Sequence, residues 1–387
     1  MRNILIISII LTTCTLTAYG QQPHEYADST ATTSASPKTG FIDKIVRYFS
    51  ESNKRSDKAF DFSIIGGPHY SSDTKFGIGL VAAGLYRHNR TDTTIQPSNV
   101  SFYGDVSTVG FYLGGIRGSH IFPADRFRLN YKVYFYSFPT HFWGIGYHMG
   151  ENSDNDTKYK RLQSKAEATF LCRLAPNIYI GPSASFQYVD ARQVDHPDLW
   201  EGQALKTTNF SLGLEFSYDS RDFIANASKG VYICMSQHFY PRFLGNRKYN
   251  FSLTEITANN YSPLWKGAIL ASQIHGQFTY GHTPWGLLST LGGSESMRGY
   301  YDGRYRDMNA VDITLELRQK IYRRSGAVVW IGAGNVFPSL KQFRWGHTLP
   351  NYGIGYRWEF KQRMNVRLDL GFGRHTTGFV FNINEAF

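Results

Sequence analysis

Four stretches of this 387-residue chain alternate between apolar and polar side chains, and they constrain its fold more than any other feature. They are residues 127–135, 210–216, 311–317 and 364–372. In the third stretch, for example, Asp312 and Thr314 alternate with apolar neighbours. Successive side chains of a β-strand point to opposite faces, so the pattern predicts strands with one apolar and one polar, partly charged face.

Composition indicates which class of β-protein this is. Aromatic residues make up 16% of the chain, glycines number 37, and the mean hydropathy is negative. After the first twenty residues no apolar run is long enough for a transmembrane helix. Half of each strand in a membrane barrel faces water in the lumen, which fits a polar, aromatic-rich chain. A soluble β-sandwich seldom has strands this long or this aromatic, so we predict an all-β, transmembrane β-barrel.

Counting the alternating segments gives an antiparallel barrel of sixteen strands, an even number as closed bacterial barrels have. The predicted strands are 60–69, 76–88, 98–107, 109–121, 125–137, 157–173, 176–191, 205–219, 228–240, 249–262, 266–280, 308–322, 325–335, 349–360, 363–373 and 377–386. Connections after even-numbered strands are mostly tight, whereas several after odd-numbered strands are long. The long ones are 138–156, 192–204, 281–307 and 336–348. This alternation predicts short periplasmic turns and long extracellular loops.

The chain divides into three parts. Residues 1–20 have the basic start, apolar centre and small terminal residues of a secretory signal peptide. Residues 21–57 form a Ser/Thr/Ala/Pro-rich linker followed by a short amphipathic helix over residues 41–49. That helix is either a plug or surface anchor beneath the barrel or a segment packed against the first strand. Residues 58–387 form the barrel.

The net charge and the motifs of the chain argue against several classes of function. The formal net charge is +11, but the basic residues are spread along the chain, which argues against a nucleic-acid partner and favours outer-membrane lipid and lipopolysaccharide. No nucleophile elbow, HExxH motif or paired catalytic acids are present, so we expect no enzyme activity, no catalytic residues, no metal site and no cofactor.

A glycine-rich segment, residues 291–307, lies between the eleventh and twelfth predicted strands. It reads LGGSESMRGYYDGRYRD and contains Met297, Arg298, Gly299 and Tyr300. This hydrophobic-Arg-Gly-aromatic string at this strand position resembles the sixth extracellular loop of the BamA/TamA superfamily of outer-membrane assembly and transport barrels, the bacterial surface antigen family. The resemblance implies that loop six folds into the lumen.

Two further segments carry the resemblance, which covers roughly residues 60–387. One is the turn after the eighth strand, and the other is the tail, which resembles the last strands of the family in Gly355, Arg357, Trp358, Glu359 and the run 367–369. The turn after the eighth strand contains Asp219, Arg221, Asp222 and Gly230, with Ala227 where the family usually has proline. The last strand alternates apolar residues, expected on its outer face, toward a terminal aromatic on the same face, similar to the signal by which barrel assembly machinery accepts its clients. That predicted signal consists of Phe379, Phe381, Ile383 and Phe387.

The resemblance also implies an ion pair between Arg298 and an acidic residue of the wall. A guanidinium carries five donors in a fixed geometry suited to carboxylates. The candidates with inward register are Glu316, Asp312, Glu359 and Asp369. The family commonly has aspartate in the thirteenth strand, but the matching position here is Gly332, so the carboxylate must come from another strand.

Residues 21–57 are too few for a periplasmic domain of ordinary size, so the resemblance is to the POTRA-less branch of the superfamily. We therefore expect a bacterial outer-membrane protein that assists protein or lipid insertion or translocation with separate periplasmic or outer-membrane partners. Two alternatives stay open: a loop-gated channel for small solutes, with a lumen lined by Lys132, Arg128 and Arg367, and a structural or dimerising barrel.

Overall fold

The alternating stretches form β-strands in the computed structural model, which describes residues 60–71, 75–86, 95–224, 226–246, 249–361 and 363–387. The predicted signal peptide, linker and amphipathic helix lie outside the described residues.

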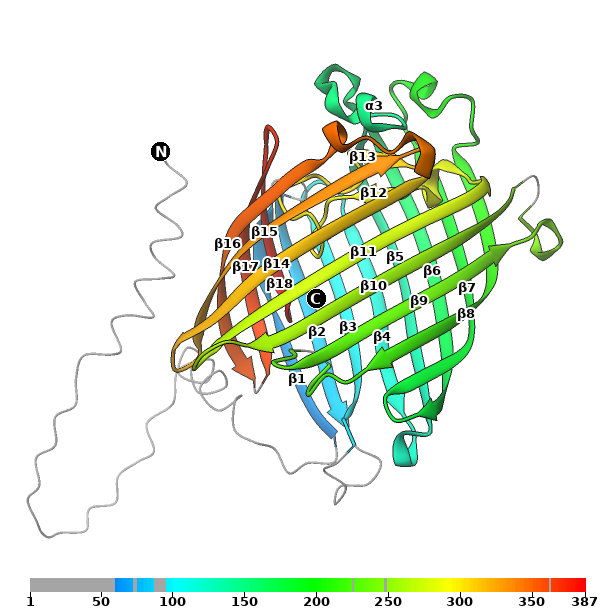
Figure 1. Cartoon of the computed structure of the whole chain (residues 1–387). Helices are drawn as coiled ribbons and strands as arrows, with labels where there is room; N and C mark the ends of the chain where they lie inside the picture. The colour runs from blue at the N-terminus through cyan, green and yellow to red at the C-terminus, as the bar shows by residue number, and fades with distance from the viewer. Residues whose placement is uncertain (1–59, 72–74, 87–94, 225, 247–248, 362) are drawn as a thin grey trace, which may run out of the picture. The chain divides into compact units, whose positions relative to one another are not determined.

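One antiparallel sheet contains sixteen of the described strands, each paired with its neighbour along the chain, and it curls into a barrel (Figure 1). Its strands are β1 (Phe60–Ser71), β2 (Lys75–Tyr86), β3 (Ser98–Ser107), β4 (Tyr112–Ile121), β5 (Phe127–Phe142), β6 (Thr157–Ala175), β7 (Ile178–Arg192), β8 (Lys206–Asp219), β9 (Gly230–Tyr240), β10 (Asn250–Pro263), β11 (Ala268–His282), β14 (Asn309–Tyr322), β15 (Ser325–Phe337), β16 (Leu349–Lys361), β17 (Met364–Gly373) and β18 (Thr376–Ile383). The predicted fold class and strand number are confirmed. Three boundaries differ by more than two residues: β4 begins at Tyr112, after a turn, β5 continues to Phe142, and β18 ends at Ile383.

The remaining elements are short and lie in the connections. They are β12 (Ser289–Leu291), β13 (Tyr305–Asp307), α3 (Tyr147–Glu151), η1 (Pro123–Asp125), η2 (Ser153–Asn155), η3 (Pro197–Trp200), η4 (Arg242–Leu244), η5 (Trp285–Leu287), η6 (Leu340–Gln342) and η7 (Trp345–His347). The long connections share one end of the barrel with α3, here named the loop end, and the tight turns lie at the opposite turn end (Figure 1). No helix in the described part of the chain has the length and hydropathy to cross a bilayer.

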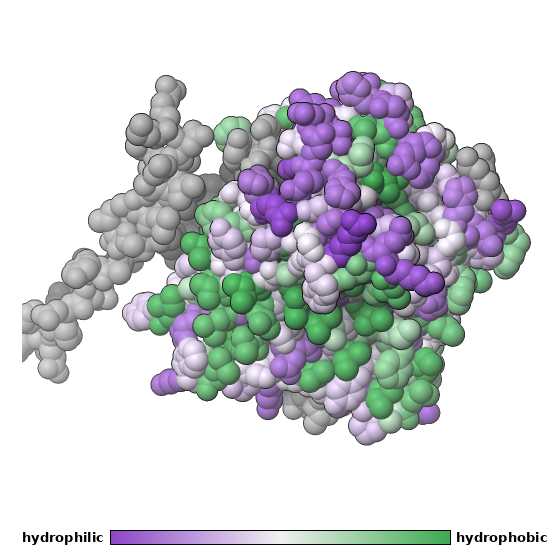
Figure 2. Space-filling model, turned by 45° about the horizontal axis from the view of Figure 1, so that its top comes forward, coloured by the Kyte–Doolittle hydropathy of each residue, from purple (hydrophilic) through white to green (hydrophobic). Residues whose placement is uncertain are grey.

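The two faces of the sheet differ as the alternation predicts. On β14, Ile313 and Leu315 are about two-fifths exposed on the outer face, whereas Glu316 on the inner face is fully buried. Figure 2 shows hydrophobic residues gathered on the side wall and hydrophilic residues at the loop end. An apolar outer wall is the surface that lipid requires, and the buried inner face can hold charges only if they are paired.

The first and last strands of the sheet differ from the others in their pairing. No ladder joins β1 to β18 among the described residues, although every other neighbouring pair is hydrogen-bonded. β18 has 8 residues and β6 has 19, so the wall is much shorter at this seam than on the far side.

Candidate functional site

The connection between β11 and β14 returns into the lumen at the loop end (Figure 1). Its strands β12 and β13 form a hairpin whose tip, residues 292–303, contacts strands β14 to β17. Apolar side chains of this loop and of the surrounding wall pack into one buried group, named here the loop cluster. Its members are Tyr147, Leu291, Met297, Tyr300, Tyr305, Ala310, Val336 and Leu349. Burying each large apolar side chain contributes about 1.5–3 kcal/mol, so this cluster helps to hold the loop inside the barrel.

Arg298 projects from the tip into a dry site on the barrel wall. Its side chain is 1% exposed, with Nη2 lying 2.5 Å from Oε2 of Glu316 and Nη1 lying 2.7 Å from Oδ2 of Asp369. The guanidinium also lies 3.7 Å from the centroid of the Trp330 ring. One cation therefore connects the loop to β14, β15 and β17 through two ion pairs and an aromatic face.

These ion pairs belong to a closed ring of alternating charges, which we name the charge ring. Its members, in order, are Arg298, Glu316, Arg318, Glu385, Arg357 and Asp369. Arg318 lies 2.7 Å from Glu316 and 3.8 Å from Glu385, and no side chain of the ring is more than 6% exposed. Removing one member of a buried ion network costs about 3–5 kcal/mol, because the partner remains buried and uncompensated.

The ring connects the loop to the end of the chain. Glu385 follows β18 and accepts from Nε of Arg357 at 2.7 Å, while Arg357 donates to Asp369, the same carboxylate that Arg298 binds. A displacement of either the loop or residues 384–387 would leave charges of the other unpaired.

Backbone contact brings the loop close enough for these ion pairs. Gly299 has φ +114°, and a Cβ there would lie 2.6 Å from the carbonyl carbon of Gly371 on β17. A Cβ on Gly371 would in turn lie 2.2 Å from the carbonyl oxygen of Arg298. The approach requires glycine at both positions, since a side chain at either would displace the loop.

Tyr300 fixes the loop next to the arginine. Its hydroxyl donates to the carbonyl oxygen of Pro350 at 2.7 Å and accepts from the amide of Arg374 at the same distance. The carbonyl oxygen of Arg298 accepts a hydrogen bond from the Asn351 side chain. Met297, Arg298, Gly299 and Tyr300 thus each make a different kind of contact with the wall.

Only two of the four carboxylates proposed as partners contact Arg298. Asp312 lies about 13 Å further along β14 than Glu316 and instead contacts His275 at 2.9 Å and Ser296 at 2.5 Å. Glu359 lies toward the turn end and contacts Lys320 at 3.4 Å and the amide of Arg363. Asp312 and Glu359 both lie on the inner face, but the alternation of a strand does not determine how far along the barrel axis a residue lies.

The thirteenth strand of the sheet, β15, contributes an aromatic ring rather than a carboxylate. Gly332 faces inward without a side chain, and Trp330, two residues earlier, lies under the guanidinium. The indole Nε1 donates to Asn351 at 2.9 Å, which fixes the ring. The two carboxylates come from β14 and β17 instead.

The predicted turn motif forms a compact contact between β8 and β9. Asp219 binds Nε of Arg221 at 2.9 Å, and Asp222 accepts from the amide and hydroxyl of Ser228. Gly230 has φ +108°, and a Cβ there would lie 2.3 Å from the carbonyl oxygen of Ser220. The motif stabilises the turn itself.

The same turn also reaches other strands. Asp222 lies 2.6 Å from Nη1 of Arg363 in the β16–β17 turn, and the carbonyl of Arg221 accepts from Gln96 before β3. Ala227, where the family usually has proline, is buried with Tyr261. Residues 220–229 therefore contact several strands at the turn end of the lumen.

The residues of the predicted terminal signal do not share one face. Phe379 and Phe381 are 45% and 52% exposed on the outer face of β18, and Ile383 ends the strand. Phe387 was expected on the outer face, but that prediction is wrong. The chain leaves the strand after Ile383, and Phe387 packs beside Tyr261 in the lumen while its carbonyl oxygen accepts from Arg318 at 2.9 Å. The buried Glu385 ion pairs favour this inward path.

Sequence reasoning missed several contributors to the site, among them Trp330, Arg318, Arg357, Glu385 and Gly371. The inward register of Trp330 and Arg318 was visible in the alternation of β15 and β14, but their contacts were not. No sequence signal placed Glu385 in the lumen, because it lies beyond the last strand. Within the described residues no three His, Cys, Asp or Glu side chains are grouped so that they could hold a metal ion.

Comparisons with known proteins agree with the barrel fold. A family model of the Omp85 superfamily domain matches residues 119–387. BamA from Haemophilus ducreyi lacking POTRA domains 1-3 is similar, with a TM-score of 0.55, 13% identity, and coverage of 83% of this chain and 70% of that chain. CdiB from Escherichia coli is similar with a TM-score of 0.55, 11% identity, and coverage of 86% of this chain and 62% of that chain, which is less than two thirds of CdiB. No curated protein matches the chain. At these identities the solved structures show a shared fold.

Proposed function

The chain belongs to the Omp85 superfamily of bacterial outer-membrane β-barrels, and on that premise we propose that it assists insertion of other proteins into the outer membrane along the edges of β1 and β18. The observation that carries this proposal is the missing ladder between these two strands within the described residues. A strand edge that is not paired presents a row of amide and carbonyl groups, which can template the strand of another chain.

The length of the last strand supports the same location. A transmembrane strand needs about 9–11 residues, and β18 has 8. β1 contains Pro68, which has no amide hydrogen and so removes one donor from that strand. Because the wall is short and its strand pairing is weakened at this place, moving an incoming strand between the lipid and the barrel requires less free energy.

The charge ring gives the remaining strands the rigidity that such an opening requires. β14, β16 and β17 each contribute a ring member, so they stay joined to the loop. Residues 385–387 turn toward arginines of the lumen, so they do not lengthen the edge of β18. We propose that the ring stabilises the barrel while the seam remains available.

Partner proteins complete the proposed function. Barrels of this superfamily work with partner proteins at the outer membrane, and we propose a separate periplasmic protein that delivers substrates to this one. Lipid and lipopolysaccharide contact the apolar outer wall.

Site-specific photo-crosslinking in cells tests the seam. A photoreactive residue at Ile64 or Phe381, which are 47% and 52% exposed on β1 and β18, should capture newly exported barrel proteins. The same residue at Leu212 or Ile354, which are 54% and 58% exposed on β8 and β16, is the matched control. Equal capture at all four positions, or none at the seam, contradicts the proposal.

A loop-gated channel is the second candidate, favoured by a cavity of about 690 Å³ inside the lumen. Deleting residues 292–303 would then raise conductance in planar bilayers. A deletion variant that conducts no better than the wild type contradicts the channel.

A further inference from the structure

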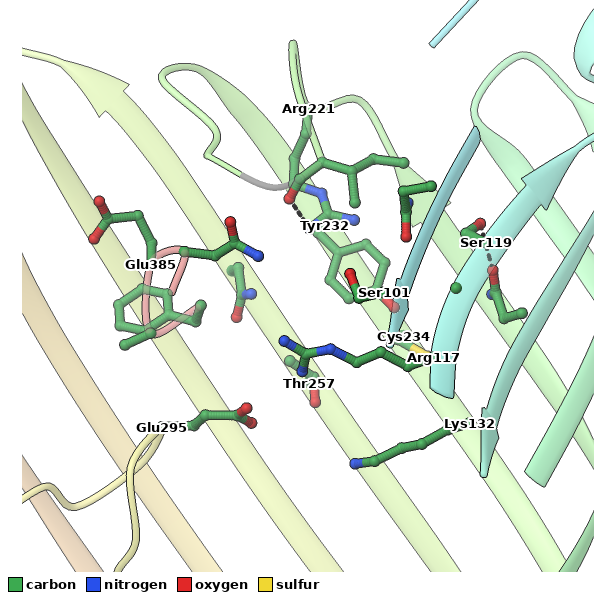
Figure 3. A pocket seen from close by; sticks show the side chains of 18 of the residues that line it. Ser101, Arg117, Ser119, Lys132, Arg221, Tyr232, Cys234, Thr257, Glu295 and Glu385 are labelled. Carbon is green, nitrogen blue, oxygen red and sulfur yellow. Dashed lines mark hydrogen bonds between the residues drawn. The ribbon is translucent and has the colours of Figure 1, made fainter. Parts of the chain in front are cut away.

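A water-accessible cavity of about 690 Å³ lies in the lumen, and of the charge ring only Glu385 lines it (Figure 3). Its wall is formed by polar residues of many strands, with the loop tip and residues 384–387 on the opposite side. The volume is within the usual range for ligand sites, which is roughly 300–1,000 Å³. The cavity is therefore large enough to hold a ligand.

Two cations on this wall lie directly opposite each other on adjacent strands. Arg117 of β4 and Lys132 of β5 are Cα partners in the ladder, and both side chains are exposed to the cavity. Directly opposed like charges destabilise a sheet, and this pair sits where a strand pair would ordinarily place opposite or neutral side chains.

Neither cation has a carboxylate partner among the described residues. Arg117 lies 5.8 Å from the ring of Tyr103, and Lys132 lies 5.4 Å from the ring of Tyr134, but no ion pair includes either cation. Glu167 of β6 is the direct ladder partner of Lys132, but its carboxylate is paired with Lys165 at 2.5 Å. The two positive charges are therefore left facing the cavity, supported by aromatic faces but not neutralised.

One carboxylate of the loop is directed toward them. Figure 3 shows Glu295 extending from the loop tip into the cavity on the side opposite Arg117 and Lys132. Its neighbours are fixed, since Arg367 donates to the carbonyl of Ser294 at 2.9 Å and Ser296 donates to Asp312 at 2.5 Å. Glu295 itself is exposed and makes no ion pair with another described residue.

We propose that Arg117 and Lys132 form a binding site for a carboxylate of an extended peptide in the lumen, and that Glu295 competes for this site. Cβ atoms of opposed strand residues are about 4.5–5.5 Å apart, so one carboxylate between the two side chains can accept from both. Glu295 indicates the ligand class, because it is a carboxylate on an extended peptide segment that already faces the pair. An entering acidic peptide would bind the two cations in place of Glu295.

The proposal deepens the proposed function, since a barrel that handles polypeptides would use such a site to hold one. Experiments can contradict the proposed insertion function and the proposed peptide site separately. Seam crosslinking reports on β1 and β18 in the membrane, whereas the peptide site is measured with purified protein.

Binding of a labelled peptide to the full-length protein in nanodiscs tests the site. The probe is a short Gly/Ser peptide with two adjacent glutamates, blocked at both ends, and binding is followed by fluorescence anisotropy. Combining R117Q and K132Q should weaken binding about tenfold or more, because two charge-assisted hydrogen bonds are lost. E295Q should strengthen binding about threefold, since the competitor loses its charge. Added salt should weaken wild-type binding, because the cations are solvated.

Lys266→Gln is the matched control, because it removes an exposed cation from the β10–β11 turn, and it should leave binding unchanged. Heat-modified gel mobility and circular dichroism verify that each variant is folded. Wild-type affinity in the folded double variant, or weaker binding in E295Q, overturns the proposal.

Two competitors separate the possible anions. An otherwise identical peptide without glutamate but with a free terminal carboxylate should compete, since the site binds a carboxylate. Inorganic phosphate should compete poorly. Displacement by phosphate alone overturns the peptide assignment and indicates a phosphate or lipid head-group site.

Discussion

Two groups of charges share one lumen, and they differ in nearly every physical respect. In the charge ring every arginine contacts a carboxylate, and no side chain is more than 6% exposed. Arg117 and Lys132 are exposed, lie opposite each other, and have no carboxylate partner among the described residues. Water screens the second group but not the first. Paired, buried charges therefore stabilise this barrel, whereas unpaired, solvated charges remain available to a ligand.

The largest expected effect comes from breaking the ring at the loop. Arg298→Ala leaves Glu316 and Asp369 buried without this cation, so the loop should lose about 3–5 kcal/mol of stability. Limited proteolysis should then cleave within residues 292–303, while the barrel remains inserted. Arg304→Ala removes another arginine of the same loop, which contacts the carbonyl of Gly150, and is the control. Equal protection of the loop in wild type and Arg298→Ala would falsify the role of the ring.

A smaller effect is expected at the other side of the ring. Glu385→Gln keeps a hydrogen-bond acceptor but removes the charge that faces Arg318 and Arg357, so it should cost about 2 kcal/mol. Thermal unfolding of the purified barrel measures this cost. Because members of one network are coupled, the double variant with Arg298→Ala should lose less than the sum of the single losses. Strictly additive losses would show that the loop and residues 384–387 are independent.

A contact at the turn end should have an intermediate, pH-dependent effect. Burial opposes ionisation of Asp222, but hydrogen bonds from Ser228 and Arg363 outweigh it and lower the pKa of Asp222 from 3.8 to about 2. Because the pKa is lower in the folded state, the ionised Asp222 carboxylate stabilises the fold at pH values above its unfolded pKa. That stabilisation is lost as the pH falls through about 2. Its size is about 1 kcal/mol, because the contact is partly solvated. Acid unfolding of Asp222→Asn should lack this component, and an acid profile identical to wild type would contradict it.

The smallest expected effect is in the cation pair. Lys132→Gln removes one of two opposed like charges, so stability should stay unchanged or rise by about 0.5 kcal/mol. Lys165→Gln on the next strand is the control, since it breaks the ion pair with Glu167 and should reduce stability. Thermal unfolding of both variants measures the difference. A clear loss of stability in Lys132→Gln would mean that this lysine is structural, like the arginines of the ring.

Much of the fold could be predicted from local patterns. The alternation of Asp312, Thr314 and Glu316 with apolar residues assigned both faces of β14, and its repetition produced the correct number of strands. The loop and its arginine were located by a short motif at a defined strand position. These features depend on neighbours in the chain, so the sequence is sufficient to predict them.

Contacts across the lumen could not be predicted in this way. Glu316 and Asp312 have the same register, yet only Glu316 reaches Arg298, since height in the barrel depends on strand tilt and stagger. Glu385 and Phe387 continue a strand-like pattern, but the structure turns them into the lumen, where Arg357 and Arg318 bind them.

The sequence by itself determined the strands, their two faces, their number and the position of the loop in the chain, because each follows from side-chain alternation or a local motif. The family resemblance implied that this loop folds inward. Only the tertiary structure decided which charges pair and which remain open. Curling the sheet brings residues from distant strands to the same depth, and that proximity joins Arg298 to Asp369 while leaving Arg117 and Lys132 facing water.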